Sequence, residues 1–118
     1  QETIDLGPRF AAHPDAFALR VRGRSMIEDL IDDGDLIVVV PTKEARDGEM
    51  VVAVHKPFGD HGAATLKRFY KGRRRVRLQP ANSAVEPILV TARDWNLEWE
   101  VQARVIEVIR RTDAYHAE

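Results

Sequence analysis

The chain has 118 residues, a formal net charge of -1 and no cysteine. A chain of this length supports one hydrophobic core, so we expect one domain with one function. The absence of cysteine excludes disulfide, zinc-thiolate and thiol-nucleophile sites, and the near-neutral charge gives no overall attraction to nucleic acid. No apolar run reaches the roughly 18 residues that span a membrane, and the first residues lack a signal-peptide pattern. We therefore expect a soluble, cytoplasmic protein.

Residues 1–15 contain prolines, a glycine and no steady hydrophobic period, which predicts an extended arm or linker. Ile4, Leu6 and Phe10 are its possible docking points. The sequence opens on glutamine rather than methionine, so we expect it to be part of a longer protein. Residues 16–118 are then the folded domain.

Short apolar segments separated by turn residues make up most of that domain. Phe17, Leu19 and Val21 alternate with other residues as in a half-buried strand. β-Branched or alternating segments bounded by turn residues predict five further strands, at residues 36–40, 50–55, 64–70, 76–79 and 88–90. The pattern predicts a mainly β domain of short antiparallel strands and hairpins, with at most one or two helical turns.

The last regular segment fits two patterns. Residues from Leu97 to Val105 alternate as in a strand, whereas Val101, Val105 and Val108 also fit a helix. Five valines or isoleucines lie between Val101 and Ile109, and this β-branched enrichment favours the strand. Because the alternation changes parity, we predict a strand with a bulge near Val105.

Ser25, in the stretch GRSMIEDLIDDGD, is the first candidate for chemistry. Residues 26–31 fit one helical turn that Ser25 could cap, with Glu28 completing a capping box. The hydroxyl is therefore either structural or nucleophilic. A nucleophilic serine needs a base within reach and donors for the oxyanion. In a tight turn, the backbone N–H groups of Ser25 and Met26 would be those donors.

The histidines are one possible source of the base. His13, His55, His61 and His116 lie in no recognisable Ser-His-Asp spacing and are too scattered for a convincing metal site. A triad with Ser25 stays open, but solvated loop positions are the simpler interpretation. The DDGD run lacks the following glutamate of a calcium loop and is interpreted as a turn. We predict no metal and no cofactor.

Lys67, in the stretch AATLKRFY, is the other possible base. On a strand Thr65, Lys67 and Phe69 share one face. Apolar surroundings disfavour the charged form of a lysine and lower its pKa, so that it can accept a proton near neutral pH. Lys67 could then take the proton of Ser25. Spacing alone favours the simpler alternative, a lysine at a strand edge whose ammonium reaches solvent.

Several motifs occur in the order found in the LexA family: RGRSMIEDLIDDGDLIVV, ARDGEMVVAV, TLKRF, LQPANSAVEPILV and ARVIEVIR. Over about Phe17 to Arg110 the sequence resembles the C-terminal self-cleavage domain of LexA-type repressors, which phage repressors and UmuD also carry. The resemblance implies a mainly β fold and a serine-lysine dyad. It places the nucleophile at Ser25, followed by Met26, and the general base at Lys67.

The resemblance also implies a function. LexA-like proteins repress DNA-damage (SOS) genes as dimers, and the RecA filament on single-stranded DNA stimulates cleavage of their own chain. We therefore expect a homodimer through the C-terminal strand, the RecA filament as a partner, and operator DNA contacted only by an N-terminal helix-turn-helix domain absent from this sequence. Neither Ala-Gly nor Cys-Gly, the usual cleaved pairs, occurs in the sequence, so we expect this chain to lack its own cleavage site.

Two alternatives stay open. A UmuD-like clipped polymerase accessory, or a phage repressor domain, would use the same fold, and the first would serve binding rather than cleavage. A signal-peptidase-like enzyme shares the Ser-Met and Lys-Arg pairs, but Lys67 and Arg68 continue here as FYKGRR rather than as a glycine-proline-rich motif.

Two further segments have a simple and a functional interpretation. Seven basic residues lie within eleven positions: Lys67, Arg68, Lys71, Arg73, Arg74, Arg75 and Arg77. The favoured interpretation is a solvated hairpin tip, and the second is a contact for an acidic partner. Asn82 and Ser83 fit a turn pair first and a loop that supports the site second. Asp33 and Asp35 are interpreted as structural.

Overall fold

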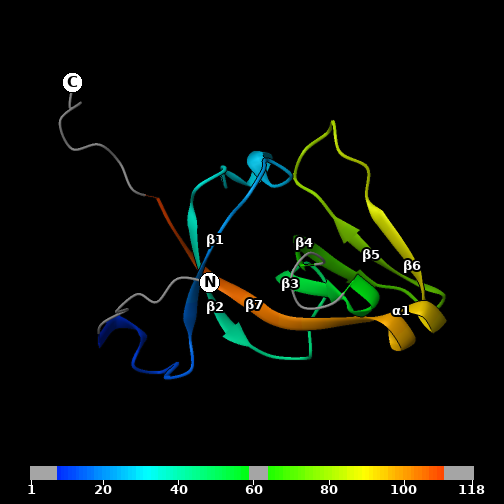
Figure 1. The fold of residues 1–118 in the computed structure, drawn as a ribbon, viewed down its shortest axis with the longest axis horizontal. Helices are drawn as coiled ribbons and strands as arrows, with labels where there is room; N and C mark the ends of the chain where they lie inside the picture. The colour runs from blue at the N-terminus through cyan, green and yellow to red at the C-terminus, as the bar shows by residue number, and fades with distance from the viewer. Residues whose placement is uncertain (1–7, 59–63, 111–118) are drawn as a thin grey trace.

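The computed structural model describes residues 8–58 and 64–110 (Figure 1). A single sheet of seven antiparallel strands has the order β1-β2-β7-β3-β4-β5-β6. The strands are β1 Phe17–Arg20, β2 Leu36–Pro41, β3 Met50–His55, β4 Ala64–Lys71, β5 Arg75–Gln79, β6 Ile88–Thr91 and β7 Trp99–Ile109. The prediction of a mainly β fold is confirmed.

The helical elements are short. They are the 3-10 turns η1 Pro8–Phe10, η2 Ile27–Asp29 and η3 Lys56–Phe58, and the helix α1 Ala92–Glu98. No helix in the described ranges is long and apolar enough to cross a membrane. Phe10 is buried, as a docking residue would be, whereas Ile4 and Leu6 lie outside the described residues. The domain boundary at residue 15 stays a prediction.

Strand β7 is the long element that joins the two ends of the molecule (Figure 1). Its residues 103–109 pair with β2, and its residues 99–104 pair with β3. The predicted bulge near Val105 is confirmed, since Val39 pairs with Val105 and Val38 with Glu107, which leaves Ile106 extra. A second bulge was not predicted: Val52 pairs with Ala103 and Ala53 with Val101, which leaves Gln102 extra.

The bulge at Gln102 lets one strand supply two hydrophobic clusters. Val101 and Ala103 are two residues apart and would share a face of a regular strand. The extra residue reverses the parity, so that the two side chains enter different clusters. The site-side cluster consists of Val21, Met26, Ile31, Ile37, Val39, Val52 and Ala103. The aromatic-side cluster consists of Val51, Ala53, Phe69, Val76, Leu78 and Val101, with Trp95 and Trp99 packed against it.

Two local predictions were wrong. Leu97, predicted to start the last strand, lies in α1, which begins after Thr91; the Thr91 hydroxyl accepts a hydrogen bond from the Asp94 N–H at 3.1 Å, a helix cap that outweighs the local alternation. Ser25 does not cap η2. Met26 occupies the capping position without a side-chain cap, because the Ser25 hydroxyl is bonded elsewhere.

The strand order places the C-terminal strand inside the sheet. Although we expect a homodimer through this strand, β7 is not an edge strand and lies between β2 and β3. β3 stops opposite Arg104, and among the described residues no strand pairs with residues 105–109 on that side. The second half of β7 therefore has a neighbouring strand along one edge only among the described residues, although the strand as a whole is internal.

Candidate active site

The turn that carries Ser25 follows directly from β1. The Val21 N–H donates to the Asp35 carbonyl at 2.8 Å, and the Gly34 N–H donates to the Val21 carbonyl at 2.9 Å, which extends the β1–β2 pairing. Gly23 has a φ of +81°, and its N–H donates to Asp33 Oδ1 at 2.7 Å. A glycine reaches this backbone conformation without steric cost, so it can turn the chain sharply toward Ser25.

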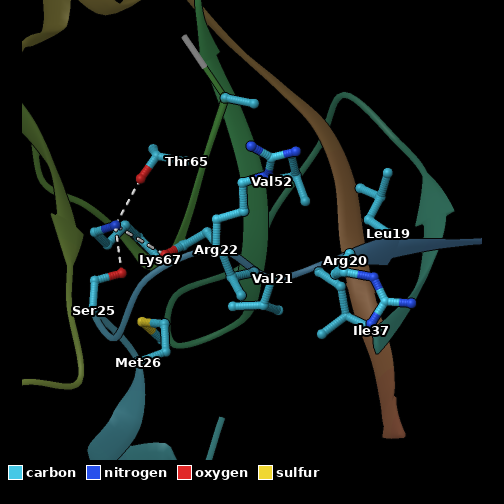
Figure 2. A pocket seen from close by; sticks show the side chains of 12 residues that line it. Leu19, Arg20, Val21, Arg22, Ser25, Met26, Ile37, Val52, Thr65 and Lys67 are labelled. Atoms are coloured by element: carbon cyan, nitrogen blue, oxygen red, sulfur yellow. Dashed lines mark hydrogen bonds between the residues drawn. The ribbon is translucent and has the colours of Figure 1, made fainter. Parts of the chain in front are cut away.

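Lys67, in the middle of β4, brings its amine to this turn (Figure 2). Its Nζ lies 3.0 Å from Ser25 Oγ, 2.6 Å from Thr65 Oγ1 and 3.1 Å from the Leu66 carbonyl oxygen. The ammonium form donates to all three oxygens. The neutral amine has two N–H donors, which match Thr65 and Leu66, and a lone pair that can accept the Ser25 proton.

The surroundings of Lys67 favour its neutral form. The residue is only 7% exposed, and burial lowers the pKa of its amine below the ordinary value. No carboxylate in the described ranges lies within ion-pair distance of Nζ to offset this effect. Lys67 is therefore suited to act as a base rather than as a fixed positive charge.

Thr65 is the site residue whose role the sequence did not indicate. It was placed on the same face of the strand as Lys67, and the structure shows its hydroxyl holding the amine. The signal was the two-residue spacing, which brings neighbouring side chains to one side of a strand. Spacing of this kind is common, so it becomes informative only once Lys67 is known to be buried.

Two backbone donors lie beside the Ser25 hydroxyl. Within the described residues, neither the Ser25 N–H nor the Met26 N–H donates a hydrogen bond. The Met26 side chain is buried in the site-side cluster and its sulfur accepts from the Ala81 N–H at 3.3 Å, which anchors this end of the turn. Unpaired N–H groups next to a nucleophile are the donors that an oxyanion needs.

Side chains from distant segments hold the turn from outside. Arg68 donates to Asp29 Oδ2 at 2.8 Å and to the Gly48 carbonyl at 2.7 Å. Arg110, directly after β7, donates to both carboxylate oxygens of Asp35 at 3.0 and 2.8 Å. The Arg110 hydrogen bonds lower the pKa of the Asp35 carboxyl, against a smaller opposing effect of burial. These aspartates are structural, as the sequence indicated for Asp35.

A cleft of about 300 Å³ opens beside the Ser25–Lys67 pair. Its walls are mostly apolar, and two arginines lie at its border (Figure 2). The lining residues away from the pair are Leu19, Arg20, Val21, Arg22, Ile37, Val52, Ala64 and Leu66. A short peptide with small or apolar side chains matches this lining in size and polarity.

The other candidates lie away from the cleft. His13 and His55 do not line it, and His61 and His116 fall outside the described residues. His55 stacks on Trp99 with ring centroids 4.6 Å apart, in a contact of the aromatic side. Nowhere in residues 8–58 and 64–110 do three His, Asp or Glu side chains gather as a metal site requires.

The predicted basic segment divides into two parts. Lys67 contacts Ser25 and Arg68 bonds to Asp29 outside the cleft, whereas Lys71 and the arginines after it are exposed on the β4–β5 hairpin. The Arg77 guanidinium lies 4.5 Å from the centre of the Tyr70 ring. The hairpin therefore has its own local contacts and shares none of the chemistry of the site.

Comparison with known proteins shows the family of the chain. Residues 1–106 match the family described as Peptidase S24-like. The chain is 43% identical over 107 residues to a LexA repressor of Roseiflexus sp. (strain RS-1), a match covering 91% of this chain and 45% of that protein. It is 43% identical over 110 residues to the LexA repressor of Koribacter versatilis, a match that covers 93% of this chain and 48% of that protein. It is 51% identical over 79 residues to the LexA repressor of Geotalea uraniireducens, which covers 67% of this chain and 37% of that protein. The chain thus spans less than half of each of these relatives.

Proposed function

Because the chain belongs to the peptidase S24-like family, we propose that it is the self-cleavage domain of a LexA-like repressor of DNA-damage (SOS) genes, with Ser25 and Lys67 as its catalytic dyad. The observation that carries this proposal is the 3.0 Å contact between Lys67 Nζ and Ser25 Oγ at one end of a cleft of peptide size. The two residues are 42 positions apart in the sequence, so local structure alone does not explain their meeting.

In the proposed reaction neutral Lys67 removes the Ser25 proton as Oγ attacks the carbonyl carbon of the cleaved peptide bond. The N–H groups of Ser25 and Met26 stabilise the oxyanion of the tetrahedral intermediate. The Lys67 ammonium, held by Thr65 and the Leu66 carbonyl, then returns the proton to the leaving amine, and an acyl group stays on Ser25. Water, deprotonated by Lys67, then attacks the ester carbonyl, and the Lys67 ammonium returns the proton to Ser25 Oγ as the new carboxyl end is released.

The substrate segment must be supplied separately in a test, because neither Ala-Gly nor Cys-Gly occurs in these 118 residues. We propose the Ala-Gly region of a LexA repressor as that segment, since its small side chains suit the apolar cleft. The lowered pKa of Lys67 predicts that the rate of peptide cleavage rises with pH and levels off, with a midpoint below the ordinary lysine value of about 10.4.

Substitutions test the two roles. Ser25→Ala and Lys67→Met should each lower the rate by at least about 1,000-fold, because nucleophile and base act as one unit. Lys71→Met is the matched control, since Lys71 lies on the same strand but is exposed; it should cleave as the unaltered chain does. The dyad is disproved if the unaltered chain is as inert as Lys67→Met and a serine-directed fluorophosphonate does not label Ser25.

We also propose that the RecA filament on single-stranded DNA stimulates the cleavage. The support is the similarity to LexA repressors over most of this chain. The test adds filament, single-stranded DNA alone or RecA alone to the complete protein at neutral pH and follows cleavage. Equal rates in all three arms, with cleavage still present at raised pH, would disprove the stimulation but not the dyad.

The similarity to LexA repressors supports a homodimer in which two copies of β7 pair. The second half of β7 also has a neighbouring strand along one edge only among the described residues. A self-complementary antiparallel pairing fits a two-fold dimer and would cover that edge. Sedimentation velocity should show a dimer at micromolar concentration, and Val108→Asp, at a partly exposed position of this half-strand, should shift it toward monomer. A chain that sediments as a monomer throughout would rule out this dimer.

A further inference from the structure

The loop after β5 lies against the Ser25 turn through several directed contacts. The Glu28 N–H donates to the Ala81 carbonyl at 2.6 Å, and the Glu28 carboxylate accepts from the Ser83 N–H at 2.8 Å. Asn82 Nδ2 donates to the Arg24 carbonyl oxygen at 2.9 Å. The loop is thus more than the turn pair that its sequence first indicated, and its contacts reach the residue directly before Ser25.

We propose that Asn82 is a positioning residue that sets the direction of the Ser25 N–H, one of the two oxyanion donors. The inference rests on the proposed function. The Arg24 carbonyl and the Ser25 N–H belong to one planar trans peptide unit and point in opposite directions. A side chain that fixes the carbonyl on one side therefore fixes the N–H on the other side.

The Arg24–Ser25 peptide has little other support. It lies outside the helices and strands, and its carbonyl accepts one further hydrogen bond, from the Ile27 N–H at 3.2 Å. The Ser25 N–H donates to nothing in the described part of the chain. With Asn82 removed, only this longer contact would oppose rotation of the peptide, and rotation would turn the N–H away from the oxyanion.

The Asn82 carboxamide is itself fixed at both ends. Its Oδ1 accepts from the Ala84 N–H at 2.9 Å, which leaves Nδ2 to face Arg24. Asn82→Asp keeps an acceptor for Ala84 but places a carboxylate oxygen against the Arg24 carbonyl. Two acceptors cannot form that hydrogen bond, so this variant removes the positioning contact while it keeps the fold of the loop.

The test compares Asn82→Asp and Asn82→Ala with matched changes at Asn96, the other asparagine of the chain, which is exposed on α1. Cleavage of the Ala-Gly peptide is measured across pH. Both Asn82 variants should lower the plateau kcat by about 100-fold, as loss of an oxyanion donor does, with KM and the pH midpoint unchanged. The Asn96 variants should keep the plateau rate.

Two measurements separate positioning from a merely structural role. Glu28→Ala removes another contact of the same loop and should keep kcat within about twofold, as surface changes do. In nitrogen-15 spectra the Ser25 amide peak should move in Asn82→Asp, while the peaks of α1 stay in place. If Asn82→Ala does not fold, the Asp variant decides, since it retains the contact to Ala84.

The outcomes separate the two proposals. A chain that neither cleaves the peptide nor reacts at Ser25 with a fluorophosphonate would overturn the proposed function. A chain that cleaves, with the plateau kcat of both Asn82 variants unchanged, would overturn only the role of Asn82. An equal loss in Glu28→Ala would also overturn it, because loop docking rather than the direction of one peptide would then control the rate.

Discussion

The Ser25 turn and the aromatic side of the sheet both contact β4, yet they are held in different ways. Around the turn, directed polar contacts join distant segments: Arg110 to Asp35, 75 positions apart, and Asn82 to Arg24, 58 apart. On the aromatic side, Phe69 packs on Trp95 at 5.6 Å between ring centroids, and Trp95 on Trp99 at 5.9 Å.

This difference follows from what each region has to provide. Packing of rings and branched side chains lowers the free energy in proportion to the buried area and has little directional demand. Hydrogen bonds to a short irregular turn contribute less free energy each but fix angles. We infer that the aromatic side supplies stability, whereas the polar contacts of the turn supply geometry.

The largest expected effect tests the aromatic side. Leu78 is fully buried there, so Leu78→Ala should lower the free energy of unfolding by about 2–5 kcal/mol in urea titrations. Peptide cleavage should keep its rate at temperatures where the variant is folded. Leu89→Ala, at a position 53% exposed on β6, is the control and should change little. A loss of cleavage in folded Leu78→Ala would contradict the division of roles.

Arg110→Ala should give a smaller loss of stability, because the Arg110 side chain is half exposed although its partner Asp35 is buried. Arg110 lowers the pKa of Asp35 in the folded protein. The stability that this pair contributes is therefore fully present above the pKa of an aspartate in the unfolded chain, about 3.9. That contribution is lost as the pH falls through the lower pKa that Asp35 has in the folded protein.

Urea titrations at neutral pH and near pH 2 measure this difference. The difference in the free energy of unfolding between the unaltered chain and Arg110→Ala should be smaller in acid. The exposed control Arg93→Ala should unfold with the same free energy as the unaltered chain at both pH values. If this difference in free energy does not change with pH, packing of the arginine, rather than its pairing with Asp35, supports the turn.

The smallest effect has the opposite sign. Leu30 has a φ of +64° and is 77% exposed at the end of η2. Leu30→Gly should raise the stability by about 0.5 kcal/mol, because the left-handed conformation costs leucine more than the added freedom of glycine costs the fold. Leu97→Gly, also exposed but inside α1, should lower it by about 1 kcal/mol. Thermal unfolding of both variants measures the contrast.

The sequence predicted the strands well because their alternation is a local property. It also indicated a bulge near Val105, because the alternation of apolar and polar residues changes parity there. It did not show that β7 lies inside the sheet, because strand order depends on pairing between segments far apart. The Thr91 cap was likewise missed at Leu97, where the strand-like alternation masked a short helix.

The candidate site divides in the same way. Ser25 and Lys67 were predicted as the dyad through a family resemblance, and spacing alone favoured an exposed lysine. For Asn82 the sequence favoured a turn and kept a loop that supports the site as the second interpretation. It could not identify Arg24 as the partner, because an asparagine in a turn can direct its amide to solvent or to another loop. Burial and long-range contacts are what the structure adds.

The two bulges of β7 also bear on how this domain can change over evolution. Substitutions in β7 alter one cluster at a time. Deletion of the extra residue Gln102 would keep Val101 opposite Ala53 and Ala103 opposite Val52, whereas deletion of a paired residue such as Glu100 would exchange the faces of the residues beyond it. Insertions in the exposed β4–β5 hairpin displace no buried side chain. Differences in length among relatives should therefore collect in that hairpin or at the bulge residues Gln102 and Ile106, while the paired residues of β7 are kept.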